Sequence, residues 1–292
     1  MIIDAHTHLY APEVAADPRG WALLNGEPGW AECVAPAGRP SIQAWSSLPR
    51  LLADMDQAGI GKCVLLGWYW ERQETCEMQN KWHLDWIRAH PDRLLAFAAV
   101  QPAAGRAAIE DLERALDAGL CGVGEILPQA QGFGYDDPWW LRVVEIAAGR
   151  GVPMTLHVTD PQAPKAAGPP TPVENYLRLA AAFPRGRFIL AHWGGGLAFR
   201  DPGPGDAPLP TNLFFDTAAS PLLYDRNIFR RALDRVGADR ILYGSDYPLR
   251  LYPRAEREPG FRRFLDEIAE SGLTPPELER VLGGNIRALL PA

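Results

Sequence analysis

The stretch CGVGEI, residues 121–126, has one charged side chain, Glu125, in a run that is otherwise small or apolar. A short apolar run of this kind, loosened by glycine, is typical of a strand that is buried on both faces. Segments with helical spacing lie on either side of it, at residues 106–119 and 138–149. The stretch therefore predicts one strand between two helices, which is the repeating unit of a parallel α/β fold.

Eight such apolar runs occur along the chain, and most are followed by a segment of helical composition. Strands that alternate with helices form parallel sheets, and eight such units close into a barrel. We therefore predict an α/β protein, a single (β/α)8 TIM barrel with long βα loops, in which residues 1–292 form one domain. The predicted strands are residues 2–6, 62–66, 94–100, 121–126, 152–157, 187–192, 212–216 and 240–246.

The helices and loops between these strands follow from the same pattern. Gly59, Gly119 and Gly149 stand where glycine commonly ends a helix. Long loops are predicted at residues 10–40, 160–171 and 194–211, and all three follow strand ends, where barrel active sites lie. The predicted helices are residues 41–59, 73–90, 106–119, 138–149, 172–183 and 226–236.

The composition excludes several classes of protein. A chain of 292 residues with 47% hydrophobic residues is long and apolar enough for a large core, and its net charge of −7 disfavours nucleic acid as a partner. No apolar run approaches the roughly 20 residues that span a bilayer, so no membrane contact is expected. The start MIIDAHTH lacks the basic and apolar segments of a signal peptide, which favours a cytoplasmic location.

The four cysteines show no CxxC spacing, and we expect them to be reduced thiols. Cys63 and Cys121 lie in apolar strand-like runs and are expected in the core. The sequence does not determine the oligomeric state, and a homo-oligomer is one of the alternatives.

Four of the six histidines, His6, His8, His157 and His192, fall at the ends of predicted strands. Strand alternation places His6 and His8 on one face, so both imidazoles can point into the barrel mouth and bind one ion. A single HxH pattern is weak evidence, but histidines from three different strands that meet at one rim indicate a metal site. By contrast, His83 lies inside a predicted helix, and we expect it to serve packing.

Two acidic residues, Glu125 and Asp246, would reach the same rim. Because an unpaired carboxylate is costly to bury, Glu125 should be exposed, paired with a cation or bound to a metal. Imidazoles and carboxylates are the ligands of zinc, manganese and iron. We expect a divalent metal, zinc first with manganese or iron as alternatives. We expect Glu125 to be a ligand in a site that holds two ions, and a one-ion site is the alternative.

Five motifs spread over the whole chain resemble the amidohydrolase superfamily: DAHTH at 4–8, LHV at 156–158, LAHWGGG at 190–196, YGSDYP at 243–248 and GGNIRALL at 283–290. The branch that this pattern resembles is the amidohydrolase-related group, which also contains aminocarboxymuconate-semialdehyde decarboxylase. The resemblance implies a metal-dependent (β/α)8 enzyme, most often hydrolytic. It also implies that His6, His8 and Asp246 bind the first metal, and that Asp246 accepts a proton from the attacking water.

The resemblance leaves the remaining candidate ligands with two sets of roles. In two-metal members a residue of the fourth strand bridges the ions, and histidines of the fifth and sixth strands hold the second ion. These positions are Glu125, His157 and His192 here. In one-metal members that resemble the decarboxylase, the fifth-strand histidine joins the first metal, and the sixth-strand histidine is left for proton transfer.

Residues beside the predicted strand ends indicate the kind of substrate. Trp68 follows the second strand and Trp193 follows His192, and such aromatic residues suit a flat or ring-containing ligand. Arg250 and Arg254 follow Asp246, and arginine favours bidentate binding of a carboxylate. We take Trp68, Trp193 and Arg250 as candidate substrate-binding residues.

The functional prediction is a metal-dependent hydrolase of a small carboxylic ester, lactone or amide, in which Asp246 and His192 are catalytic. The alternative is a metal-dependent, non-oxidative decarboxylase of an aromatic or muconate-like acid. The two reactions need nearly the same ligands, because the metal can stabilise either an oxyanion or the charge left by departing carbon dioxide. In both cases the expected partner is a small molecule, ring-containing and carboxylated.

Overall fold

A computed structural model describes residues 1–38, 41–161, 170–201, 203, 207–250 and 258–291. Eight parallel strands form a closed ring with helices around it, which confirms the predicted (β/α)8 barrel. The strands are β1 Ile2–Thr7, β2 Ile60–Leu65, β3 Leu94–Ala96, β4 Val123–Ile126, β5 Pro153–Leu156, β6 Arg187–Leu190, β7 Leu213–Asp216 and β8 Ile241–Leu242.

The ring consists of two hydrogen-bonded arcs, one of β1–β3 and one of β4–β8. Two seams join the arcs. At one seam, the Ala98 amide donates to Gly122 O at 2.9 Å, just beyond β3. At the other, the Ala5 amide of β1 donates to Tyr243 O at 2.8 Å, just beyond β8. The barrel is therefore closed by a few backbone hydrogen bonds at each seam.

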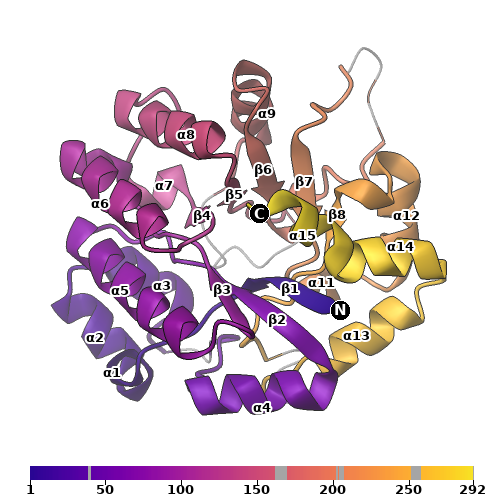
Figure 1. Ribbon diagram of the computed structural model, residues 1–292, viewed down its shortest axis with the longest axis horizontal. Helices are drawn as coiled ribbons and strands as arrows, with labels where there is room; N and C mark the ends of the chain where they lie inside the picture. Colours follow the sequence, from indigo (N-terminus) through magenta and orange to yellow (C-terminus); the bar gives the residue numbers. More distant parts are fainter. Residues whose placement is uncertain (39–40, 162–169, 202, 204–206, 251–257, 292) are drawn as a thin grey trace.

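The helices surround the strands, and α15 lies across one end of the ring (Figure 1). That end is the one where the strands begin, because the Arg187 guanidinium at the start of β6 donates to Leu289 O of α15. The helices are α1 Pro12–Ala16, α2 Pro18–Leu24, α3 Pro28–Val34, α4 Leu48–Ala58, α5 Gln73–Ala89, α6 Arg106–Asp117, α7 Pro128–Gln131, α8 Pro138–Arg150, α9 Val173–Ala182, α10 His192–Gly195, α11 Ser220–Leu223, α12 Asn227–Val236, α13 Arg262–Ala269, α14 Pro275–Glu279 and α15 Asn285–Leu289.

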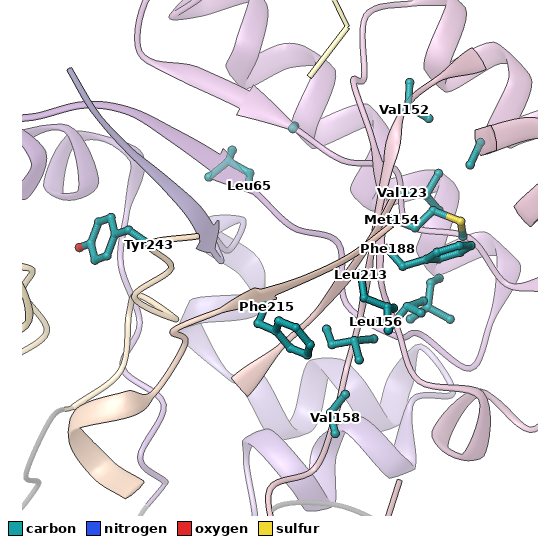
Figure 2. Packing of buried hydrophobic residues seen from close by; sticks show 14 of the residues in the cluster. Leu65, Val123, Val152, Met154, Leu156, Val158, Phe188, Leu213, Phe215 and Tyr243 are labelled. Carbon is teal, nitrogen blue, oxygen red and sulfur yellow. The ribbon is translucent and has the colours of Figure 1, made fainter. Parts of the chain in front are cut away.

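Two layers of apolar side chains hold this arrangement. Residues of β4 to β7 such as Val123, Met154 and Phe188 belong to the large buried cluster between strands and helices (Figure 2). A second cluster combines strand residues, among them Ile3, with Ile286 of α15. Since α15 closes the amino end of the barrel, a cavity that serves chemistry has to open at the carboxyl end.

The loop predicted at residues 10–40 contains three short helices, α1, α2 and α3. Each begins with a proline at its first position, Pro12, Pro18 or Pro28, where the missing amide hydrogen costs nothing. These helices are too short to show an apolar periodicity, which is why the sequence indicated a loop. The helix predicted at residues 41–59 starts later, at Leu48, because Ser47 caps it by accepting the Arg50 amide.

The structure also tests the predictions for helix ends, cysteines and membrane-spanning segments. Gly59 adopts the left-handed conformation that ends α4, as predicted, whereas α8 runs past Gly149 and ends at Gly151. None of the four cysteines, all of which are described, forms a disulfide; Cys63 is buried, but Cys121 is only partly buried. None of the helices among the described residues combines the length and the apolar character needed to span a bilayer.

Candidate metal and substrate site

Four predicted ligands meet at the carboxyl end of the barrel. His6 Nε2 and His8 Nε2 lie 3.3 Å apart. Glu125 Oε2 is 3.9 Å from the first nitrogen and 4.0 Å from the second. Asp246 Oδ1 is 3.6 Å from His6 Nε2 and 3.5 Å from His8 Nε2. The nitrogens of both imidazoles thus face the same two carboxylate oxygens.

These distances suit a metal ion. With bonds of about 2.1 Å, the ligand atoms of a tetrahedral zinc site lie about 3.4 Å from one another. The distances from the two imidazole nitrogens to the two carboxylates, 3.5 to 4.0 Å, are close to that spacing. They exceed hydrogen-bond length, so these atoms do not satisfy one another. The residues present therefore fit a divalent cation.

A second group of possible ligands shares Glu125. Its Oε1 lies 2.8 Å from His157 Nδ1 and 3.8 Å from His192 Nε2. One ligand atom each from Glu125, His157 and His192 fits within 4.8 Å of the others, and the same holds for Glu125 with His6 and His8. The two oxygens of Glu125 thus face different pairs of histidines.

The outer nitrogens of three imidazoles, those of His6, His8 and His192, are held by neighbouring acceptors. His6 Nδ1 lies 2.8 Å from Asp216 Oδ2, at the end of β7. His8 Nδ1 lies 3.3 Å from Leu66 O, and His192 Nδ1 lies 3.2 Å from Ala218 O. A proton on Nδ1 in each ring leaves the Nε2 lone pair directed at the cluster, as metal binding requires.

Asp216 also fixes the backbone of the sixth-strand histidine. Its Oδ1 accepts the amide hydrogens of His192 at 2.9 Å and Ala218 at 3.0 Å. One fully buried carboxylate therefore orients His6 through one oxygen and His192 through the other. In the sequence Asp216 marked only a strand end; an acidic residue at the rim of a barrel strand was the signal that could have revealed this role.

The electrostatics of the cluster favour negative carboxylates. Burial alone would raise the pKa of Glu125, but the facing imidazoles of His157 and His6 bring it well below its usual range. Burial would also raise the pKa of Asp246, but the facing imidazoles of His8 and His6 outweigh it and lower the pKa. Burial lowers the pKa of His6, but the neighbouring carboxylates outweigh it and raise the value to about 10. The cluster attracts positive charge, from protons or from a cation.

The backbone departs from strand geometry where these ligands sit. His192 and Asp246 have φ values of 54° and 62°, in the left-handed region that non-glycine residues rarely adopt. Such conformations cost about 1–3 kcal/mol each and cluster at functional sites. Gly124 lies so close to β5 that a Cβ there would meet Thr155 O at 2.4 Å. The absence of a side chain at Gly124 thus lets the strand that carries Glu125 approach β5 closely.

A cavity of about 290 Å³ opens directly on the cluster, with His8, Glu125, His157, His192 and Asp246 in its wall. The volume lies near the lower end of the ~300–1,000 Å³ typical of small-molecule sites. The rest of the wall is mainly apolar or aromatic and includes Val34, Ile42, Trp68, Tyr69, Ala219, Leu222, Leu223 and Leu249.

Of the three candidate substrate-binding residues, Trp68 lines the described cavity, whereas Trp193 and Arg250 do not. Trp68 lines the cavity, and its ring stacks on the His8 imidazole with centroids 4.2 Å apart. Trp193, in contrast, is fully buried in the core and donates to Ser220 Oγ, because the left-handed turn after His192 directs it away from the cavity. Arg250 is half-buried and is not part of the described cavity wall. Arg254 lies outside the described residues.

The comparisons with known proteins agree with this geometry. The family model described as Amidohydrolase matches residues 3–292, and a search among curated proteins finds no match. Among solved structures, a 5-carboxyvanillate decarboxylase from Sphingomonas paucimobilis is similar with a TM-score of 0.74 and 18% identity, over 99% of this chain and 98% of that one.

A 2,6-dihydroxybenzoate decarboxylase from Rhizobium is similar with a TM-score of 0.67 and 20% identity, over 99% of this chain and 98% of that one. A dihydroxybenzoic acid decarboxylase from Polaromonas, with bound manganese and the inhibitor 2-nitroresorcinol, has a TM-score of 0.70 and 20% identity, over 99% and 96%. At these identities the structures establish the barrel fold. The match of the family model to almost the entire chain establishes that the protein belongs to the amidohydrolase family.

Proposed function

We propose that this protein is a metal-dependent, non-oxidative decarboxylase of a small aromatic carboxylic acid. The observation that carries the proposal is the apolar, aromatic-walled cavity that opens directly on the ligand cluster. Such a cavity suits a flat ring whose carboxylate reaches the metal. The decarboxylases among the similar solved structures support the same choice. Decarboxylation therefore replaces hydrolysis as the first functional hypothesis.

The first ion would be held by His6, His8, Glu125 and Asp246, through the four atoms that face one another. A divalent ion bound there would polarise a substrate oxygen and offset negative charge that develops on the ring. Manganese is the first ion to supply, because the similar Polaromonas structure contains it. Zinc, the ion expected from the ligand types, is the second.

The protein's own residues would orient the ring and transfer one proton to it. Trp68 and Tyr69 flank the cluster and exclude water from one side of the cavity. The carbon–carbon bond to the carboxylate breaks, its electron pair stays on the ring carbon, and a proton replaces the carbon dioxide that leaves. His192 would take up that proton from solvent on Nε2, which faces Glu125, and pass it to the ring carbon while Ala218 O holds its Nδ1.

The decisive experiment measures carbon dioxide release from a panel of aryl carboxylic acids by protein reconstituted with manganese or zinc. In parallel, the same preparations are offered esters, lactones and amides. We expect carbon dioxide from at least one acid, with loss of that activity in His192→Ala. The matched control is His90→Ala, which changes a histidine outside the cavity wall. Turnover confined to the ester, lactone or amide panel would overturn the proposal.

One observation favours hydrolysis as a second candidate. Glu125 reaches His157 and His192 as well as His6 and His8, so the cluster offers ligands for two ions. Two cations bridged by a carboxylate are typical of metal-dependent hydrolases. Hydrolysis of an ester or lactone that requires two ions per chain would establish this candidate in place of the decarboxylase.

A further inference from the structure

We infer that Gln43 recognises a hydrogen-bond donor, such as a hydroxyl or amino group, on the ring of the substrate. The inference deepens the proposed function and rests on its assumption that a ring-containing carboxylic acid occupies the cavity. It assigns a role in substrate selection to one residue of the segment between α3 and α4.

Gln43 is firmly held beside the turn that carries Asp246. It forms an antiparallel bridge with Leu249, and the next amide, that of Ala44, donates to Pro248 O at 2.7 Å. Gln43 is only 4% exposed, and it lines the same cavity as Asp246 and Leu249. Because backbone hydrogen bonds fix its loop to the chain just beyond Asp246, its position relative to the ligand cluster is defined.

The hydrogen bonds of the side chain determine which end of the amide is free. Gln43 Nε2 donates to two backbone carbonyls, Ala44 O and Pro248 O, each at 3.2 Å. A flipped amide would place its oxygen against both carbonyls, so the orientation is unambiguous. Among the described residues no group donates a hydrogen bond to Oε1. This oxygen is also not one of the fully buried side-chain atoms that lack a hydrogen-bond partner. Oε1 is therefore the accessible end of a largely buried side chain.

The neighbouring polar group of the wall is already satisfied. Ser41 Oγ donates to Val34 O at 2.6 Å and accepts the Gln43 amide at 2.9 Å. The amide oxygen of Gln43 is thus an acceptor with no competing partner among the described residues of its loop. A substrate hydroxyl would pair with it, whereas a group of similar size that cannot donate would leave it desolvated and unpaired.

The test compares binding of hydroxybenzoates with that of the fluorobenzoates substituted at the same ring position. Fluorine is similar in size to a hydroxyl but cannot donate a hydrogen bond. Dissociation constants are measured by titration calorimetry on the manganese-loaded wild type, on Gln43→Met and on Ser41→Ala. The Ser41→Ala variant disturbs the same loop but retains the amide oxygen, so it controls for structural damage.

For at least one ring position, we expect the wild type to bind the hydroxy compound about three- to tenfold more tightly than its fluoro counterpart. That ratio should fall to about one in Gln43→Met and persist in Ser41→Ala. A purely structural role would weaken both compounds equally and leave the ratio unchanged. A wild type without the preference, or a preference that survives Gln43→Met, overturns the inference.

Failure of the proposed function gives a different result. Absence of binding by any benzoate to the manganese-loaded wild type counts against an aromatic acid as substrate and overturns the inference with it. Because binding is measured without turnover, the Gln43 result stands whether or not carbon dioxide is released. The two hypotheses are therefore tested separately.

Discussion

Glu125 is a carboxylate at the centre of four imidazoles, with one oxygen toward His6 and His8 and the other toward His157 and His192. No lysine or arginine forms an ion pair with it among the described residues. The imidazoles alone can offset the free-energy cost of burying this carboxylate only when they are protonated. A bound cation offsets that cost while the imidazoles remain neutral. This placement is the physical basis for a metal-binding role.

We predict up to two ions per chain in the wild type and at most one in Glu125→Ala, with His6 and His8 still occupied. Removal of the shared carboxylate leaves two cations unscreened from each other. Metal analysis after dialysis against saturating manganese or zinc measures the ratio. The control is Glu27→Gln, since Glu27 is equally buried but caps the Glu71 and Arg72 amides. One ion in both wild type and Glu125→Ala would mean that Glu125 is structural.

Asp216 gives a second prediction at this scale. In Asp216→Asn the amide oxygen can still accept from the His192 amide, which turns the NH2 group toward His6 Nδ1. His6 would then carry its proton on Nε2 and could not bind a metal through it. We expect metal affinity to fall about 10- to 100-fold, as measured by competition with a chelator. Asp225→Asn, at an exposed turn, should retain full affinity; equal affinity in the two variants would contradict the role of Asp216.

At the scale of the elements, the apolar runs predicted each strand but not where it ends. The run at residues 240–246 keeps only Ile241 and Leu242 as β8, because the backbone then turns to give Asp246 its left-handed conformation. Hydrophobicity reports burial, and these residues are buried whether or not they continue the ladder. The prediction that Trp193 binds substrate was wrong for a related reason. Its neighbour His192 faces the cluster, but the turn between them reverses the direction of the Trp193 side chain.

The candidate ligands were predictable because the ends of parallel strands share one rim, whatever the loops do. The roles of Gln43 and Asp216 were not predicted. The sequence places Asp216 at the rim of the barrel, but it does not show which groups its carboxylate or the amide of Gln43 contacts. Their roles depend on contacts across 205 and 210 residues, to Pro248 and His6. Such contacts are fixed by packing and leave no periodicity in the sequence.

Helix α5 gives a prediction for pH. His83 is fully buried on α5, its Nδ1 lies 3.0 Å from Phe97 O, and burial lowers its pKa to about 4. Because the unfolded chain binds this proton near pH 6.5 and the folded chain does not, the stability contribution is present above pH 6.5 and is lost toward pH 4.

Between pH 7 and pH 5, the free energy of unfolding of the wild type should fall by about 2 kcal/mol more than that of His83→Gln. Urea denaturation of the metal-free proteins at both pH values measures this difference. Groups common to both proteins, including the ligand cluster, cancel in the comparison. Equal losses in the two proteins would show that His83 is protonated in the folded state.

At the scale of the whole molecule, the candidate ligands come from both arcs of the barrel. His6 and His8 belong to or follow β1 in the first arc, while Glu125 and Asp246 belong to or follow strands of the second. A bound ion would fasten the arcs together at the carboxyl end, beside seams that contain few hydrogen bonds of their own.

Removal of the metal should therefore lower the melting temperature and weaken the seams first. An ion at 100 times its dissociation constant adds about 2.7 kcal/mol of stability. We expect chelation to speed hydrogen exchange at the seam amides of Ala5 and Ala98 more than at Phe97, which donates to Leu65 O within one arc. Uniform acceleration at all three amides would show that the ion does not act at the seams.

The two seams also determine when the site can exist during synthesis. The first candidate ligand is residue 6 and the last is residue 246. A nascent chain thus carries two candidate ligands, His6 and His8, long before β8, the strand that closes the ring, has been made. A chain truncated before Asp246 would lose both the closing seam and a candidate ligand of the first ion, so tight capture of that ion would distinguish a closed barrel from a chain that lacks β8.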